Sequence, residues 1–293
     1  MKITFIGLGN MATAMLGGIL ASGIAAKEDI IGADKSAEAS ERARARFGIN
    51  IAANNKTAVA AADLVVLAIK PQTAAEALAE IKGHLAPQAI VLSIMAGKTI
   101  EWMARQLTAP VNQPGSAAPA DTPPPPHQPA DMPRHTPKIV RTMPNTPALV
   151  GAGVTGASRN AEVSYAEMKM CLELLGSFSK AEEVPETLMD AVVGVSGSGP
   201  AYVFLFIDAL AEAAVAAGMP REQAVRFAAG TVLGGARMVL ETDKTPAELT
   251  EMVCSPGGTT IEAVKVFAEK GFRDLVIAAA TAAMEKSKRL AGE

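Results

Sequence analysis

The sequence predicts an α/β protein, with an N-terminal Rossmann-like domain built on a parallel sheet and a following all-α dimerisation domain. Short apolar strands alternate with helical patterns as far as Met143, which is typical of a parallel sheet covered by helices. A glycine-rich turn follows the first of these strands. After about Ser164 the strand patterns give way to helices, several of them apolar nearly all round, and such helices predict burial against another subunit.

The first strand and the turn after it predict a dinucleotide site. Lys2–Gly7 is a short apolar run with β-branched residues, as a buried parallel strand requires. Gly7 permits a tight turn, and Gly9 lets a diphosphate approach the backbone. Ala12 occupies the third position of the G-x-G-x-x-G/A fingerprint, inside a helix that starts at Asn10. The predicted cofactor-binding residues therefore begin with Gly7, Leu8, Gly9, Asn10 and Met11.

The remaining elements follow in order. Further strands are expected at Asp29–Asp34, Asp63–Ile69, Ala89–Met95 and, as the final strand, Lys138–Met143. The helices between them are expected at Ser36–Phe47, Asn55–Ala61, Ala74–Ile81 and Thr99–Leu107. Beyond them we expect only helices, at Ser164–Phe178, Glu186–Val195, Gly199–Gly218, Arg221–Glu241, Pro246–Val253, Thr259–Glu269 and Phe272–Leu290. This pattern places the domains at 1–163 and 164–293, with cofactors at the carboxyl ends of the strands.

One segment breaks the alternation. Between Pro110 and Pro137, 10 of 28 residues are proline, which excludes a helix or a central strand. We interpret residues 108–137 as a disordered-type surface insertion in the first domain. A docking site for a proline-recognising module is the alternative.

Composition limits the functions that the chain can have. The formal charge is −3 and the sequence contains no basic cluster, which argues against nucleic-acid binding. Its two cysteines, Cys171 and Cys254, suit a reduced cytoplasmic protein and form no metal-ligand spacing, so no metal is expected. The N-terminus is a strand rather than a secretory signal, and we expect no apolar run long enough to cross a membrane.

A second glycine turn lies near the other end of the chain, in SPGGTTIEAV, from Ser255 to Val264. Two glycines precede two threonines where a helix would begin, and a helix N-terminus binds carboxylate or phosphate groups. An ordinary capped helix start would have a similar sequence.

Six stretches together resemble the pyrroline-5-carboxylate reductase family: FIGLGNMATAM, AIKPQ, SIMAG, VRTMPNTPALVGAGVTG, GVSGSGPAYVF and SPGGTTIEAV. The resemblance runs from Met1 to about Leu290, without the proline-rich insertion. It implies reduction of L-1-pyrroline-5-carboxylate to L-proline with NADPH or NADH, the last step of proline biosynthesis. It also implies homodimers with intertwined helical domains, which can assemble into larger rings.

The resemblance also implies roles for individual residues. The substrate carboxylate would be held by Ser255, Gly257, Gly258, Thr259 and Thr260. Thr260 is the catalytic candidate, hydrogen-bonded near the imine nitrogen, unless it only caps its own helix. The predicted cofactor-binding residues further include Asn55, Ala68, Ile69, Lys70, Pro71, Ala96, Gly97 and Asn145. The glycine-rich break at Ser196–Pro200 either lines the substrate pocket or allows close helix packing.

At the end of the second strand the chain departs from many relatives, which carry an Asn-Arg pair there. Asp34 and Lys35 take this place, and both are predicted to lie at the cofactor. An acidic residue favours the ribose 2′-hydroxyl of NAD, whereas Lys35, Arg42 and Arg44 could offset its charge. The sequence therefore leaves the preference between NADPH and NADH open, and we expect use of both cofactors.

Two other functions fit parts of the sequence. A β-hydroxyacid dehydrogenase would have similar architecture, but it would need a lysine where this chain has GVSGSGPAYVF. A non-catalytic dinucleotide sensor could keep both glycine turns, so only an assay separates it from an enzyme.

Overall fold

The computed structural model describes residues 1–108 and 136–292, which form two compact units. The first unit comprises Met1–Gly197 and Lys286–Glu293, and the second comprises Ser198–Glu285. Apart from residues 108, 136 and 137, the insertion predicted at 108–137 lies outside the described residues.

The first unit is built on an eight-stranded sheet with the order β3-β2-β1-β4-β5-β6-β7-β8. Its strands are β1 (Ile3–Ile6), β2 (Ile30–Ala33), β3 (Asn50–Ile51), β4 (Leu64–Leu67), β5 (Ile90–Ser93), β6 (Lys138–Met143), β7 (Gly153–Arg159) and β8 (Ser179–Glu183). All neighbouring strands are parallel except β6 and β7. The strand order reverses beside β1, and a topological switch point of this kind is where such sheets bind ligands.

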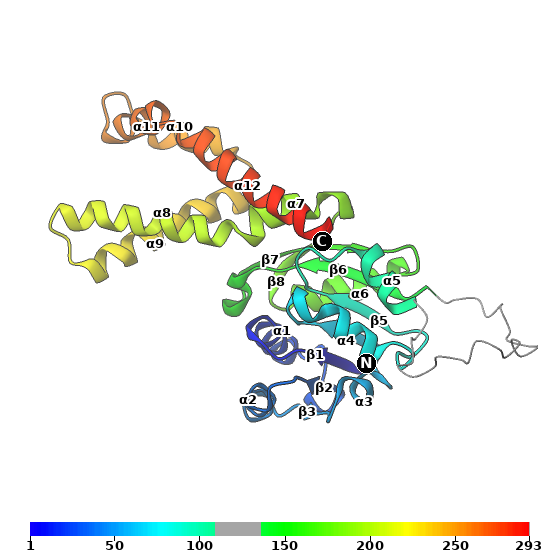
Figure 1. Cartoon of the computed structure of the whole chain (residues 1–293). Helices are drawn as coiled ribbons and strands as arrows, with labels where there is room; N and C mark the ends of the chain where they lie inside the picture. Colours follow the sequence, from blue (N-terminus) through cyan, green and yellow to red (C-terminus); the bar gives the residue numbers. More distant parts are fainter. Residues whose placement is uncertain (109–135, 293) are drawn as a thin grey trace, which may run out of the picture. The chain divides into compact units, whose positions relative to one another are not determined.

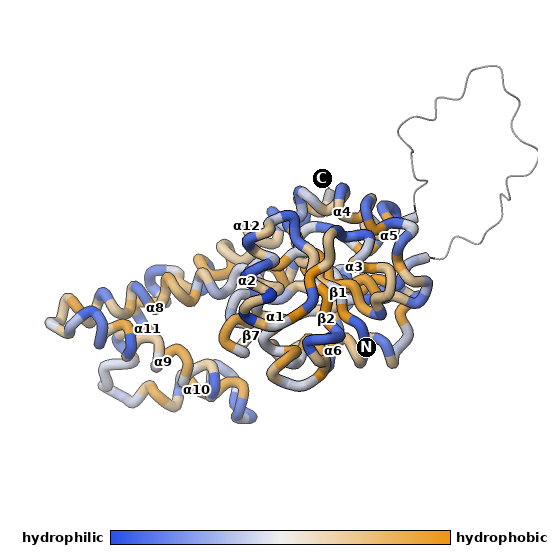
Figure 2. The backbone as a smooth tube through the Cα atoms, turned by 90° about the horizontal axis from the view of Figure 1, so that it is seen from below, coloured by the Kyte–Doolittle hydropathy of each residue, from blue (hydrophilic) through white to orange (hydrophobic). Residues whose placement is uncertain are grey.

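Helices cover both faces of this sheet (Figure 1), because the strands bury apolar side chains on both. Ile3 and Phe5 point into one core, and Ile6 into the other. The first core is completed by α1 (Asn10–Ala21), α2 (Ala37–Phe47) and α6 (Tyr165–Gly176). The second is completed by α3 (Asn55–Val59), α4 (Ala74–Ile81) and α5 (Ile100–Thr108). The apolar character of β1 and β2 is visible as orange in Figure 2. The predicted class of the first unit is confirmed.

Three strands were not predicted from the sequence: the two-residue β3, and β7 and β8. Lys138–Met143 is not the final strand, because β7 pairs antiparallel with it and β8 then pairs with β7. The expectation that no strand follows Ser164 is wrong for the same reason. Since α6 packs against the sheet and β8 belongs to it, the first unit extends past the predicted boundary at residue 163. The end of the C-terminal helix also belongs to it, where the Ser287 hydroxyl donates to Asp190 Oδ1 at 2.7 Å.

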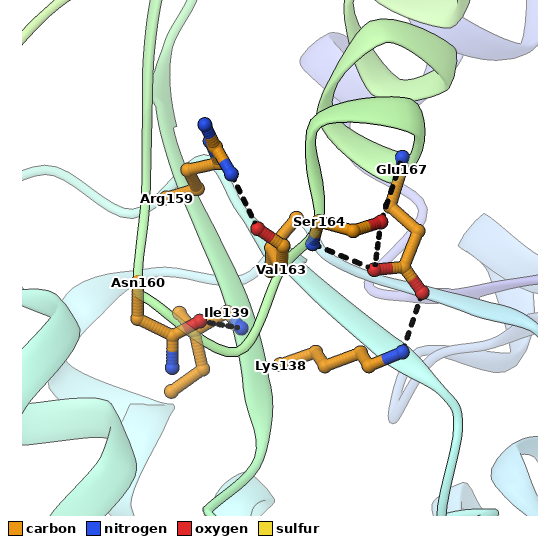
Figure 3. A network of polar contacts seen from close by, with 7 residues as sticks. All are labelled: Lys138, Ile139, Arg159, Asn160, Val163, Ser164 and Glu167. Carbon is orange, nitrogen blue, oxygen red and sulfur yellow. Dashed lines mark hydrogen bonds and ion pairs between the residues drawn. The ribbon is translucent and has the colours of Figure 1, made fainter.

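A polar network fixes the start of α6 to β6 (Figure 3). Glu167 Oε2 accepts from both the amide and the hydroxyl of Ser164 at 2.8 Å, which completes a capping box. Glu167 Oε1 accepts from Lys138 Nζ at 2.5 Å. Nearby, the Ile139 amide donates to Asn160 Oδ1 at 3.1 Å, and Arg159 donates to the Val163 carbonyl at 2.5 Å. The Lys138 hydrogen bond, with those from Ser164, lowers the pKa of the Glu167 carboxyl below its usual 4.5.

This lowered pKa predicts a specific acid sensitivity. A carboxyl with a depressed folded-state pKa stabilises the fold fully above its unfolded pKa, and this contribution is lost as the pH falls through the folded value. The difference in unfolding free energy between the wild type and Glu167→Gln should therefore be constant near neutral pH and shrink below about pH 4.5. Urea denaturation across this pH range measures it, with Glu173→Gln on the same helix as matched control. A difference that grew on acidification would contradict the assignment.

The second unit contains helices only. It is formed by α8 (Gly199–Ala216), α9 (Arg221–Glu241), α10 (Pro246–Val253), α11 (Thr259–Glu269) and most of α12 (Phe272–Gly292). Its buried core is small and centres on Ala211, Ala224 and Ala228, where α8 packs on α9. Large apolar side chains are exposed along its helices, among them Leu205, Phe227, Leu233, Leu240 and Leu275. Such a surface is expected of helices that pair with another subunit.

Two expectations about the helical stretch that ends with α8 are corrected. The predicted glycine-rich break at Ser196–Pro200 overlaps a π-helical turn, Val193–Gly197, which follows α7 (Met189–Val192). Among the described residues, the helical stretch Glu186–Ala216 is long and apolar enough to cross a membrane by length and composition alone, and 6% of its most apolar window is buried. The expectation that no stretch reaches this length and hydropathy is therefore wrong.

Candidate functional site

A cavity of about 270 Å³ opens in the first unit at the carboxyl ends of β1, β2 and β4. It is lined by Ile6, Gly7, Gly9, Asp34, Lys35, Asn55, Ala68, Ile69, Lys70, Thr73 and Ala77. Eight of these are residues predicted to bind the cofactor. The structure therefore brings together, at the switch point of the sheet, residues as far apart in the chain as Ile6 and Ala77.

The two glycines of the first turn have different surroundings. Gly7 has φ +95°, and a Cβ added there would lie 2.4 Å from the Ala68 carbonyl oxygen, so the fold itself requires glycine. Gly9 has φ −76° and ψ −167°, which any residue adopts, and an added Cβ would meet nothing within 4 Å. The open space over Gly9 fits a group that approaches the backbone from the cavity.

Helix α1 starts at this space. Its N-cap residue is Gly9, and no side chain caps it. The first-turn N–H groups and the positive end of the helix dipole are therefore available to an anion at the cavity. A diphosphate fits this end of the helix, as it does in other glycine-turn sites.

Asp34 connects β2 to the glycine turn. Its Oδ2 accepts from the Leu8 amide at 2.7 Å, and its Oδ1 accepts from the Ser36 amide at 2.8 Å. The carboxylate is half-buried at the cavity wall. Asp34 therefore holds the turn in place besides presenting negative charge to the cavity.

Two other predicted residues on the rim are paired with acidic side chains of α4. Lys35 Nζ lies 2.6 Å from Glu76 Oε2, and this hydrogen bond raises the pKa of Lys35 above 10.5. Asn55 Nδ2 donates to Glu80 Oε2 at 2.6 Å. Glu76 and Glu80 lie one helical turn apart, so one face of α4 holds both rim residues.

Seven predicted cofactor residues do not line the cavity: Leu8, Asn10, Met11, Pro71, Ala96, Gly97 and Asn145. Leu8 is buried under the turn, and Asn10 and Met11 form the first turn of α1. Gly97 has φ +70°, and a Cβ there would lie 2.8 Å from Leu290 Cβ on α12. Their contacts with a cofactor stay predictions.

Asn145 is buried, and its side-chain amide connects the segment at Ser196 to the start of β7. Its Oδ1 accepts from the Val154 amide at 2.9 Å, and its Nδ2 donates to the Ser196 carbonyl at 3.0 Å. The side chain thus fixes the π-helical turn of the SGSG segment to the start of β7.

Three residues of the cavity wall were not predicted from the sequence: Ile6, Thr73 and Ala77. The partners Glu76 and Glu80 were not predicted either. Thr73 and Ala77 lie four positions apart directly after the predicted Ile69–Pro71 loop. A small residue on the helix face that follows a cofactor loop is a usable signal, because a bulky one would fill the site. The pairing of Lys35 with Glu76 spans 41 positions and has no signal in local sequence.

The second glycine turn lies in the second unit, before α11. Gly257 has φ +71°, and the Gly258 amide donates to the Ser255 carbonyl at 3.0 Å, which closes the turn. Gly258 is the N-cap, and no side chain caps the helix. Thr260 follows in the first turn, half-buried, while Ser255 and Thr259 are exposed. The alternative in which Thr260 caps its own helix is therefore wrong, and the first-turn N–H groups are available to an anion.

Two family models match this chain. A model described as pyrroline-5-carboxylate reductase dimerisation matches residues 186–290, which include the exposed apolar helices of the second unit. A model described as NADP oxidoreductase, coenzyme F420-dependent, matches residues 2–97, which include every residue that lines the cavity.

Relatives resemble the chain over its whole length. A pyrroline-5-carboxylate reductase of Escherichia coli K12 is 45% identical over 289 residues, which cover 99% of this chain and 98% of the relative. The structure of a pyrroline-5-carboxylate reductase from Coxiella burnetii superposes with a TM-score of 0.84 at 34% identity, covering 99% of this chain and 98% of the other. The Plasmodium falciparum pyrroline carboxylate reductase, solved with NADP bound, gives 0.81 at 30% identity with the same coverage. The family predicted from the sequence motifs is confirmed: this chain belongs to the pyrroline-5-carboxylate reductases.

Proposed function

We propose that this protein reduces L-1-pyrroline-5-carboxylate to L-proline with NADH or NADPH, the last step of proline biosynthesis. One observation supports this above all others: each unit presents an uncapped helix behind a glycine turn, in a chain similar over 99% of its length to reductases of this substrate. One such turn suits a dinucleotide diphosphate, and the other suits a small carboxylate.

The cavity residues fit a nicotinamide dinucleotide. The α1 N-terminus and the backbone at Gly9 would hold the diphosphate, and the wall formed by Asp34, Lys35 and Asn55 would hold the adenosine ribose. Ile69, Lys70 and Pro71 would support the ribose and diphosphate. Ala96, Gly97 and Asn145 would shape the loop beside the nicotinamide. When bound, the reduced cofactor supplies a hydride.

The turn in the second unit would orient the imine. We propose that Ser255, Gly257, Gly258, Thr259 and Thr260 hold the substrate carboxylate through backbone N–H and hydroxyl groups. The imine is basic enough to be protonated near neutral pH, so its carbon is already electrophilic. Orientation then supplies most of the rate enhancement. The Thr260 hydroxyl would hydrogen-bond near the imine nitrogen and keep the proton there.

Thr260→Val tests this role, because it keeps the shape of the side chain and removes the hydroxyl. We expect kcat/KM for the imine to fall at least about tenfold, or roughly 1.4 kcal/mol, while dinucleotide affinity stays unchanged. Thr250→Val on α10 is the matched control, since its hydroxyl only donates to the Pro246 carbonyl one turn earlier. Equal kinetics for Thr260→Val and the wild type would remove Thr260 from the site.

A direct assay separates the proposed function from the alternatives. Purified protein should oxidise NADH and NADPH when the cyclic imine is present, and neither cofactor should be oxidised without it. The reverse assay with a 3-hydroxy acid and NAD(P)⁺ tests the hydroxyacid dehydrogenase. Dinucleotide binding without turnover of either substrate would identify a sensor.

We also propose a homodimer as the minimal unit, with dimers assembled into a larger ring. The dimerisation match over 186–290 and the exposed apolar helices support the dimer. The dimer would then cover the apolar stretch Glu186–Ala216, in a cytoplasmic protein that binds neither membrane nor nucleic acid. Light scattering after size exclusion, without detergent, should give a mass of two or more chains. A monomer, or a requirement for detergent, would contradict this assembly.

A further inference from the structure

Two acidic residues of α4 hold the cavity rim next to Asp34. Glu76 pairs with Lys35 at 2.6 Å, and Glu80 accepts from Asn55 at 2.6 Å. Ala77, between them in sequence, lines the cavity. Since this rim follows β2, it is where a fold of this kind meets the adenosine ribose and any 2′-phosphate.

We propose that Glu76 is a specificity-determining residue that disfavours NADPH relative to NADH by holding the Lys35 ammonium group. The inference rests on the proposed function, because it takes the cavity as the site of the adenosine ribose. Glu76 acts here as a positioning residue, through Lys35.

The physical reason is an exchange of ion pairs. A 2′-phosphate carries nearly two negative charges and needs a cation at the rim. To donate to it, Lys35 must leave Glu76, so one ion pair replaces another instead of being added. Asp34 and Glu80 also lie at this rim and repel the phosphate. A 2′-hydroxyl has no such cost, because it is neutral.

The pair is weak enough for substitution to shift selectivity rather than abolish binding. Both side chains are 61% exposed, and solvent screens such pairs strongly. Glu76→Gln keeps the size of the side chain and frees Lys35. We expect the ratio of NADP⁺ to NAD⁺ affinity to rise about threefold to fivefold in this variant. The corresponding ratio of kcat/KM values should rise equally, through KM rather than kcat.

The experiment is calorimetric titration of the full-length protein with NADP⁺ and NAD⁺, without imine, for the wild type, Glu76→Gln, Lys35→Met and the double variant. In the Lys35→Met background, Glu76→Gln should lose at least half of its effect on the affinity ratio, because the released cation is gone. An undiminished effect would show direct repulsion and overturn the role of Lys35. No rise in the ratio for Glu76→Gln would overturn the proposal outright.

Glu101→Gln is the matched control. Glu101 is an exposed residue of α5 paired with Arg105, so the substitution makes the same change in net charge away from the rim. If the ratio of NADP⁺ to NAD⁺ affinity rose equally in this control, net charge alone would explain the effect, and the proposal would be overturned. Dinucleotide binding with the expected shift but without imine reduction would leave this inference standing and contradict the proposed function. Imine reduction without any shift in the affinity ratio would support the proposed function and overturn this inference.

Discussion

Gly9→Ala should abolish tight dinucleotide binding and leave the fold intact. The backbone at Gly9 suits alanine, and an added Cβ touches nothing within 4 Å, so the variant can fold without strain. The same methyl group would occupy the space through which a diphosphate reaches the first turn of α1. We expect affinity for NADH and NADPH to fall at least about 100-fold, or roughly 2.7 kcal/mol, with an unchanged thermal midpoint.

Gly7→Ala is the contrasting variant. Its Cβ would lie 2.4 Å from the Ala68 carbonyl oxygen, at a φ of +95°. Backbone strain and steric overlap together should cost at least about 3 kcal/mol of unfolding free energy. Isothermal titration and thermal unfolding of both variants separate the two roles. Dinucleotide affinity within twofold of the wild type in Gly9→Ala would show that no diphosphate approaches the turn.

Glu186→Gln should destabilise the first unit more than any other substitution that neutralises one charged side chain of that unit. Glu186 Oε1 accepts from Arg141 Nη1 at 3.0 Å and from the Ile100 amide, the first of α5, at 2.8 Å. The Arg141 side chain is only 7% exposed, in the middle of the sheet. Removing its partner charge leaves a buried guanidinium uncompensated, which costs about 3 kcal/mol.

Chemical denaturation of Glu186→Gln measures this cost. Glu183→Gln is the matched control, since Glu183 pairs with the more exposed Arg159 at 2.9 Å. Loss of that pair should cost less than about 1 kcal/mol. Equal losses in the two variants would show that burial of Arg141 does not set the energy of its ion pair.

The sequence predicted those elements whose signals are local. The β1 strand, its glycine turn and α1 lie within 21 residues, and the apolar runs of β4 and β5 are buried on both faces. The strands β7 and β8 were missed because GVTGASR and SKAEE contain few of the apolar residues that mark a strand. Their stability comes from pairing and from α6, which local sequence does not show.

The candidate site, like the fold, was predictable only where the signal is local in sequence. Residues of the glycine turn could be assigned because a glycine-rich turn between a strand and a helix is typical of a dinucleotide site. Those of the Ile69–Lys70 loop were assigned through the resemblance to the family. The contacts that hold these residues were not predictable. Asp34 reaches the Leu8 amide across 26 positions, and Asn145 reaches Ser196 across 51. Only the folded chain determines which polar groups meet over such separations.

On this protein a hydride should pass directly from a nicotinamide cofactor to the carbon of a cyclic imine. The most direct measurement of this transfer uses NADH deuterated at the transferred position, with L-1-pyrroline-5-carboxylate as acceptor and mass spectrometry of the product. We expect L-proline with one deuterium at the former imine carbon, formed in equal amount to the NADH consumed. Unlabelled proline, or NADH consumption without proline, would contradict it.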